Sequence, residues 1–165
     1  MELPERIHFF SWETRVSLEL PIGFEEEGED SETNSAIYVD EVPDSAPEDA
    51  IAARVMAKMT AVPHGRPDAY RSLAEASANI DSRTVEDREE LVIDGAPAVC
   101  QVLRYRDEEL DVGVLRHETF AQLENVVFSI IGLAPEGRSA EYRPAFDHAA
   151  ETARLILLPA PGGEA

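Results

Sequence analysis

Hydrophobic and polar residues alternate near the start of the chain. Apolar side chains recur at every second position, with Ser17 and Glu19 between them: Val16, Leu18, Leu20 and Ile22. A period of two residues is typical of a strand with one buried face. The pattern predicts a strand within 6–24, which Pro21 and Gly23 bring to an end.

An acidic segment follows, with the sequence EEEGEDSE over 25–32. Six of its eight residues are acidic, so the segment is predicted to be a solvated loop. The alternative is a contact surface for a basic partner, formed by its carboxylates: Glu25, Glu26, Glu27, Glu29, Asp30 and Glu32.

The same segment was considered as a calcium site. Asp30, Glu32 and Asn34 fall on alternate positions, as at the start of an EF-hand loop. Ser35 stands where that loop needs glycine at its sixth position, although Glu41 stands at its twelfth. Half of the pattern is missing, so no calcium site is predicted.

The middle of the chain predicts a short strand over 36–41 and a helix over 67–79. The helix rests on apolar spacing of three and four residues from Tyr70 to Ser77. Between them, 51–62 is ambiguous, because Ala and Met favour a helix whereas the alternation from Ile51 to Met59 fits a strand. We favour the strand, because Pro63 and Gly65 close the segment after a strand's length.

Four consecutive antiparallel strands are predicted over 83–135. Asp94-Gly95 suits the positive φ angles of a two-residue type I′ turn. This turn places Ile93 opposite Ala96 and Val92 opposite Pro97.

The last strand of this group and the segment after it predict how the sheet is covered. Val126 to Leu133 are apolar on both faces, which indicates a central strand. An amphipathic helix is predicted with Pro144 in its first turn. Its apolar positions are Tyr142, Phe146, Ala149, Ala153 and Ile156. Residues 159–165 are expected to be a disordered tail.

Composition limits the class of protein. A chain of 165 residues predicts one domain, here 1–158. A net charge of −20 argues against nucleic acid as a partner, and no apolar run is long enough for stable membrane insertion. The first residues lack a basic segment followed by an apolar run, which favours a cytoplasmic protein, although a removed signal would leave the same sequence.

Candidate catalytic chemistry is sparse. Cys100, the only cysteine, shares a strand face with apolar Ala98 and Val102 and is expected to fill core. His117 and Glu118 are neighbours in a strand, so their side chains point to opposite faces. The other histidines are scattered and, like His117, are expected to lie on the surface or to cap elements: His8, His64 and His148. No metal, cofactor or catalytic residue is predicted.

The order of elements resembles a known fold family. It is carried by LELPIGF at 18–24, IDGAPA at 93–98, GLAPEG at 132–137 and FDHAAETARLI at 146–156. The arrangement is similar to the PsbP-like fold, which includes the PsbP subunit of photosystem II, the Ran-release factor, DcrB-type and mycobacterial lipoproteins, and cytoplasmic Eag-type chaperones of secretion effectors. The resemblance implies an α+β protein, specifically an α/β sandwich. A central antiparallel sheet of six or seven strands would carry one mid-chain and one C-terminal helix, without a catalytic centre. A lipobox cysteine is absent, which argues against a lipoprotein.

Within that family, the absence of an export signal favours a cytoplasmic bacterial chaperone or adaptor for a secreted or injected effector. Its partner would be another protein, bound through apolar helices, and a homodimer stays open. The pattern suggests one apolar face for this contact: Val99, Leu103, Tyr105, Leu110, Val112 and Val114. The alternative is that this face packs under the predicted helices. A structural or assembly protein that uses the acidic segment is the second hypothesis, and an enzyme with a site assembled from distant residues is the third.

Overall fold

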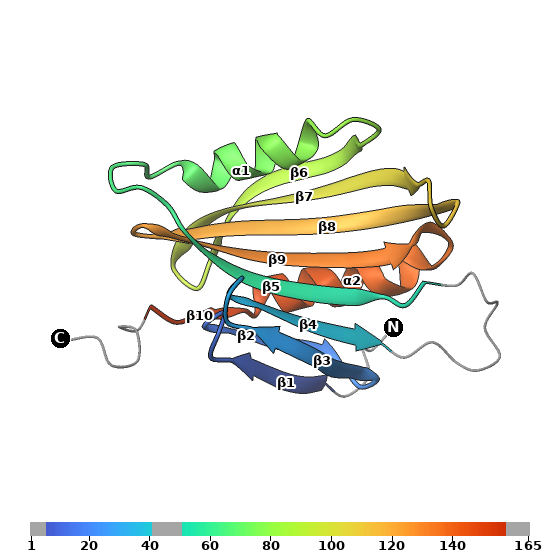
Figure 1. Ribbon diagram of the computed structural model, residues 1–165, viewed down its shortest axis with the longest axis horizontal. Helices are drawn as coiled ribbons and strands as arrows, with labels where there is room; N and C mark the ends of the chain where they lie inside the picture. Colours follow the sequence, from blue (N-terminus) through green and yellow to red (C-terminus); the bar gives the residue numbers. More distant parts are fainter. Residues whose placement is uncertain (1–5, 41–50, 158–165) are drawn as a thin grey trace.

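A computed structural model describes residues 6–40 and 51–157. The described chain is an α+β fold of strands with two α-helices (Figure 1). The first strands are β1 (Arg6–Ser11), β2 (Val16–Pro21), β3 (Phe24–Asp30), β4 (Ser35–Asp40) and β5 (Arg54–Ala61). The later strands are β6 (Thr84–Ile93), β7 (Ala96–Asp107), β8 (Val112–Leu123), β9 (Val126–Pro135) and β10 (Arg154–Leu155). The helices are α1 (Ala69–Ala78) and α2 (Ser139–Glu151), and a 3₁₀ turn, η1 (Glu136–Arg138), precedes α2.

Seven strands form one antiparallel sheet in the order β3-β4-β5-β9-β8-β7-β6. A smaller sheet has the order β1-β2-β10. The predicted sandwich with a central antiparallel sheet, a mid-chain helix and a C-terminal helix is therefore confirmed. Within the described residues, no helix is long and apolar enough to cross a membrane.

The Asp94-Gly95 hairpin forms as predicted. Both turn residues have positive φ angles, 47° and 81°, and Ile93 lies opposite Ala96. Asp94 also accepts hydrogen bonds from the Leu155 backbone N–H at 2.9 Å and from the Arg154 guanidinium at 3.2 Å. The turn thus connects the seven-stranded sheet to β10.

The two helices cover opposite faces of the large sheet. Adjacent residues of a strand point to opposite sides, so the contacts of two neighbouring residues show which helix lies on which face. Glu118 of β8 is hydrogen-bonded to Ser77 of α1, whereas the adjacent His117 is hydrogen-bonded to Asp147 of α2. We call these sides the α1 face and the α2 face.

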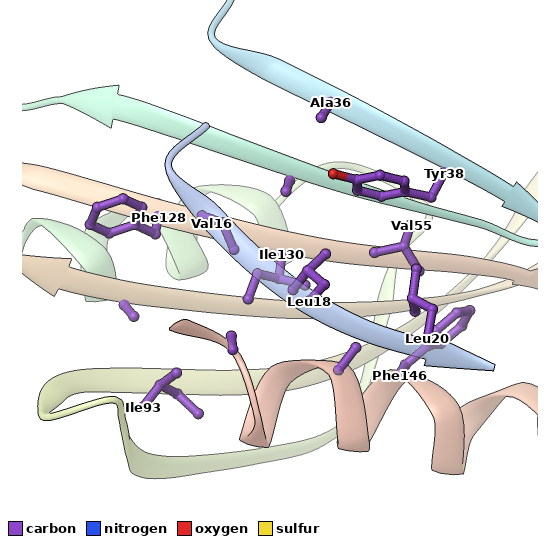
Figure 2. Packing of buried hydrophobic residues seen from close by; sticks show 14 of the residues in the cluster. Val16, Leu18, Leu20, Ala36, Tyr38, Val55, Ile93, Phe128, Ile130 and Phe146 are labelled. Atoms are coloured by element: carbon purple, nitrogen blue, oxygen red, sulfur yellow. The ribbon is translucent and has the colours of Figure 1, made fainter. Parts of the chain in front are cut away.

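The main core lies on the α2 face, between the large sheet, α2 and β2. Figure 2 shows Val16, Leu18 and Leu20 of β2 beside Ile130 and Phe146. These side chains are almost completely buried, and each large one contributes about 1.5–3 kcal/mol by leaving water.

Three sequence predictions of local structure are wrong at their boundaries. The single strand predicted within 6–24 is a hairpin of β1 and β2, because the chain reverses between Ser11 and Val16. The C-terminal helix ends at Glu151 and gives way to β10, so Ile156 is outside it. The helix also begins at Ser139, which places Pro144 beyond its first turn.

The ambiguous segment 51–62 is a strand over Arg54–Ala61, as we favoured. The acidic segment is largely strand β3 rather than a loop, because its backbone pairs with β4 while its carboxylates stay in solvent. Glu41 and the predicted tail over 159–165 lie outside the described residues.

Candidate partner-binding face

Five of the six predicted apolar residues lie on one face of the sheet, the α1 face, and α1 covers part of it, whereas Leu110 lies in the turn between β7 and β8. Val99 of β7 packs in a small core cluster with Tyr70 and Ala74 of α1 and Phe120 of β8. Leu103 is fully buried, and Val99 and Val114 are only 3 % and 4 % exposed. These three side chains are too deeply buried in this structure to meet a partner.

The other three predicted residues are more accessible. Tyr105 is half-buried, with the guanidinium of Arg83 5.2 Å from its ring centre. Val112 is half-buried at the start of β8, and Leu110 is 50 % exposed in the turn before it. Whether this end of the face binds a partner stays a prediction.

A buried polar network fixes α1 to the sheet. The Glu118 carboxylate is fully buried and accepts hydrogen bonds from Ser77 Oγ at 2.7 and 2.8 Å, Gln101 Nε2 at 2.8 Å and Arg116 Nε at 2.8 Å. Gln101 Nε2 also donates to the Ala74 carbonyl at 2.8 Å. Because every bond on Glu118 is charge-assisted, the network holds α1 more firmly than its small apolar cluster would alone.

Beside α1, the same face continues over β4, β5 and β9, and no helix formed by the described residues lies on it (Figure 1). Register places apolar side chains in two adjacent rows there. The rows contain Ile37, Val39, Met56, Ile131 and Leu133. None of these five belongs to either core cluster, and all except the 9 % exposed Ile131 are half-buried. We call this region the open half of the α1 face.

Two cations of β5 share this surface with the apolar side chains. Arg54 and Lys58 are both exposed and lie on β5 on either side of Met56, on the same face. Neither forms an ion pair with any residue that the structure describes. The nearby Arg116 differs, because it forms an ion pair with Glu118 at 2.8 Å.

The predicted acidic contact residues lie on the edge strand β3 and the turn after it. All six carboxylate residues named above are exposed, and the Asp30 carboxylate accepts a hydrogen bond from the Glu32 N–H at 2.9 Å. Register places Glu25 and Asp30 on the α1 face and Glu26 and Glu29 on the other. The structure therefore divides these carboxylates between two faces instead of gathering them at one site.

Sequence reasoning missed a polar cluster on the α2 face. His117 Nε2 lies 3.5 Å from Cys100 Sγ and 2.7 Å from Asp147 Oδ1. His117 is 1 % exposed, so the expectation of a surface or capping histidine is wrong for it. Seventeen and thirty residues separate the three positions, and no local motif signals such a contact.

The electrostatics of this cluster favour a charged histidine. Burial lowers the pKa of His117, but its hydrogen bond to Asp147 and its contact with Cys100 outweigh burial and raise the pKa to about 9. The same hydrogen bond lowers the pKa of Asp147.

The cluster does not have the geometry of a nucleophilic triad. Cys100 and Asp147 approach the same ring nitrogen, whereas a triad orients the base through one nitrogen and activates the nucleophile through the other. Among the described residues, no group of three or more His, Cys, Asp or Glu side chains is placed to hold a metal ion.

Comparisons with known proteins identify the fold. No family model and no curated protein matches the sequence. A solved structure of LpqN, described as involved in cell envelope biogenesis of Mycobacterium tuberculosis, matches with a TM-score of 0.70 and 12% identity over 90% of this chain and 89% of LpqN. A Pseudomonas aeruginosa protein of unknown function, PA94, described as a putative regulator, matches with a TM-score of 0.57 and 19% identity over 95% of this chain and 99% of that one.

A third match is the cyanobacterial PsbP (CyanoP) of Synechocystis, with a TM-score of 0.57 and 11% identity over 94% of this chain and 95% of that protein. The fold is therefore PsbP-like. At these identities the similarity establishes the fold alone.

Proposed function

We propose that the chain is a non-catalytic protein-binding module, a cytoplasmic bacterial chaperone or adaptor that holds an apolar helix of a secreted or injected effector. The observation that carries this proposal is the open half of the α1 face. Five apolar side chains lie there outside both core clusters, next to a half of the same face that α1 already covers. Contiguous apolar surface on a folded domain is typical of a site for another protein.

The open half belongs to a sheet that is already formed before a partner binds. Its contacts would form on a preformed sheet, so the partner alone loses conformational freedom on binding. A chaperone of this kind keeps an apolar helix of its client away from water until the client moves on.

Site-specific photocrosslinking in the native host tests the proposal. A photoreactive residue replaces Met56, and a matched control replaces Val92, an apolar residue 69 % exposed at the end of β6. The expected result is one crosslinked protein from position 56 alone, with the crosslink in an apolar helix. The soluble level of this crosslinked protein should fall when the gene for the present chain is deleted. Equal crosslinking from both positions, or a partner whose level does not depend on the chain, would contradict the proposal.

The acidic edge strand supports a second candidate, an adaptor for a basic partner. Such binding would be lost at high salt and on replacing Glu25, Glu27 and Glu29 by Gln, and it would survive Ile37→Asp. Binding to the open half should instead survive high salt and the three glutamate replacements and be lost in Ile37→Asp, because Ile37 lies in its apolar rows and β3 contributes no residue to them.

A further inference from the structure

The exposed cations of the open half limit the chemistry of the partner. Arg54 and Lys58 are four residues apart on β5, which corresponds to about 13 Å along the strand. Met56 lies between them, with Ile37 and Ile131 beside it on the neighbouring strands. The surface is thus an apolar centre with one cation at each end.

These two cations belong to a strongly acidic chain. The chain carries 34 acidic and 14 basic residues, and Lys58 is its only lysine. Most arginine side chains that form hydrogen bonds or ion pairs within the described residues face a carboxylate, as Arg71 faces Glu90 at 2.6 Å and Arg116 faces Glu118 at 2.8 Å. Arg54 and Lys58 form no ion pair with a carboxylate of the described residues, and acidic groups of a partner would complement their charge.

The open half has the width of one helix. β4, β5 and β9 are three adjacent strands, so the outer two are about 10 Å apart, close to the diameter of a helix with side chains. Over the adjoining half, α1 packs on β7 and β8 through Tyr70 and Ala74. A helix from a partner, lying beside α1, would complete the layer on this face.

We infer that the partner helix carries two carboxylates seven residues apart, with apolar side chains at the third and fourth positions after the first. This inference rests on the proposed function and specifies its partner. Two helical turns bring positions i and i+7 to the same face at about 10.5 Å, and the long Arg and Glu side chains span the remaining distance to 13 Å. The apolar residues between them would lie over Met56 and its neighbours.

Other partners fit this surface less well. A nucleic-acid backbone would meet two cations among the described residues of the open half. Glu25 and Asp30 of β3 lie two strands from β5, in the same cross-strand rows as Arg54 and Lys58, and their negative charge opposes phosphate binding. A basic helix would place like charges against Arg54 and Lys58. An uncharged apolar helix would fill the rows but leave both cations without partners.

Calorimetric titration with three synthetic helical peptides, each about 18 residues long, tests the inference. They share an apolar face and differ only at the two positions, which hold Glu, Gln or Lys. The Glu peptide should bind the wild-type chain about threefold to tenfold more tightly than the Gln peptide at low salt, and high salt should remove the difference. The Arg54→Glu/Lys58→Glu variant should reverse the order and prefer the Lys peptide.

A matched control is Arg6→Glu/Arg66→Glu, which changes the net charge equally at exposed positions away from β5. It should keep the preference for Glu. Equal binding of the Glu and Gln peptides, with both lost in Ile37→Asp, would overturn this inference and leave the proposed function standing. Failure of all three peptides to bind would overturn both.

Discussion

His117 of β8 and Asp147 of α2 form an ion pair across the main core, with 2.7 Å between Nε2 and Oδ1. The histidine is 1 % exposed at its side chain, whereas the carboxylate is 49 % exposed. Each group favours the charged form of the other, and Arg143 further lowers the pKa of Asp147. The pair therefore joins α2 to the sheet through charges that depend on pH.

Stability should fall at alkaline pH through this pair. The folded pKa of His117, about 9, lies above its ordinary value of 6.5, so its contribution is complete below about pH 6.5 and is lost as pH rises through 9. We expect the free energy of unfolding to drop by about 3 kcal/mol from pH 6.5 to pH 10, measured by urea denaturation. Asp147→Asn should make the curve flatter, because the neutral amide no longer holds the proton on His117.

Cys100→Ala tests the effect of the sulfur apart from the effect of the Asp147 carboxylate, since both groups contact His117 Nε2. The alanine variant should keep part of the pH dependence, because the hydrogen bond to Asp147, the largest single effect that raises the pKa of His117, is still present. If the free energy of unfolding of Asp147→Asn fell with pH as steeply as that of the wild type, the ion pair would be ruled out as the origin of the pH dependence.

Removal of the Ser77 hydroxyl should loosen α1. Ser77 Oγ donates to the buried Glu118 carboxylate, so Ser77→Ala is expected to cost about 1–3 kcal/mol. Hydrogen exchange should show faster exchange in the amides of α1 and unchanged exchange in α2. Ser72→Ala is the matched control, because Ser72 is an exposed serine of the same helix. Equal loosening in the two variants would exclude the bond to Glu118 as the cause, because alanine is a better helix former than serine and Ser72→Ala alone should not loosen α1.

Local sequence patterns predicted much of the fold. Asp94-Gly95 encodes its own turn, because few residue pairs adopt two consecutive positive φ angles, and the turn then sets the register of Ile93 with Ala96. The apolar run over 126–133 predicted a central strand, and β9 is the middle strand of the seven-stranded sheet and is covered on its α2 face. These features depend on neighbours in sequence.

The errors come from interactions between distant segments. β3 carries charges on both faces, which is compatible with an edge strand, and only its pairing with β4 shows that it is a strand. The alternation in β7 placed Val99 and Leu103 on one face correctly, but it contained nothing about which half of that face α1 covers. His117 and Asp147 meet through the packing of α2, so no motif predicted their contact.

Gly132 should resist substitution because a ring occupies the space above it. A Cβ at this position would lie 2.5 Å from Phe146 Cγ in the main core. Gly132→Ala is expected to cost about 1–3 kcal/mol, seen as a lower thermal midpoint. Phe146→Leu in the same chain should recover part of the loss relative to Phe146→Leu alone. At Gly28 on β3, a Cβ would meet nothing within 4 Å, so Gly28→Ala should be nearly neutral. A similar loss at both positions would exclude steric overlap with Phe146 as the cause.

The carboxylates of β3 should keep the chain from pairing with itself. β3 is an outer strand of the seven-stranded sheet, so the backbone groups on its outer side have no partner strand in that sheet, and charge on an edge disfavours the approach of a second edge. Replacing Glu25, Glu27 and Glu29 by Thr, which favours strands, should produce dimers or larger species as concentration rises, measured by light scattering during size-exclusion chromatography. A control triple replacement, Glu75→Thr/Glu108→Thr/Glu109→Thr, removes the same charge from exposed positions outside the strands and should not change the mass. Association in both variants would attribute the effect to lower net charge, whereas association in the β3 variant alone follows from the edge.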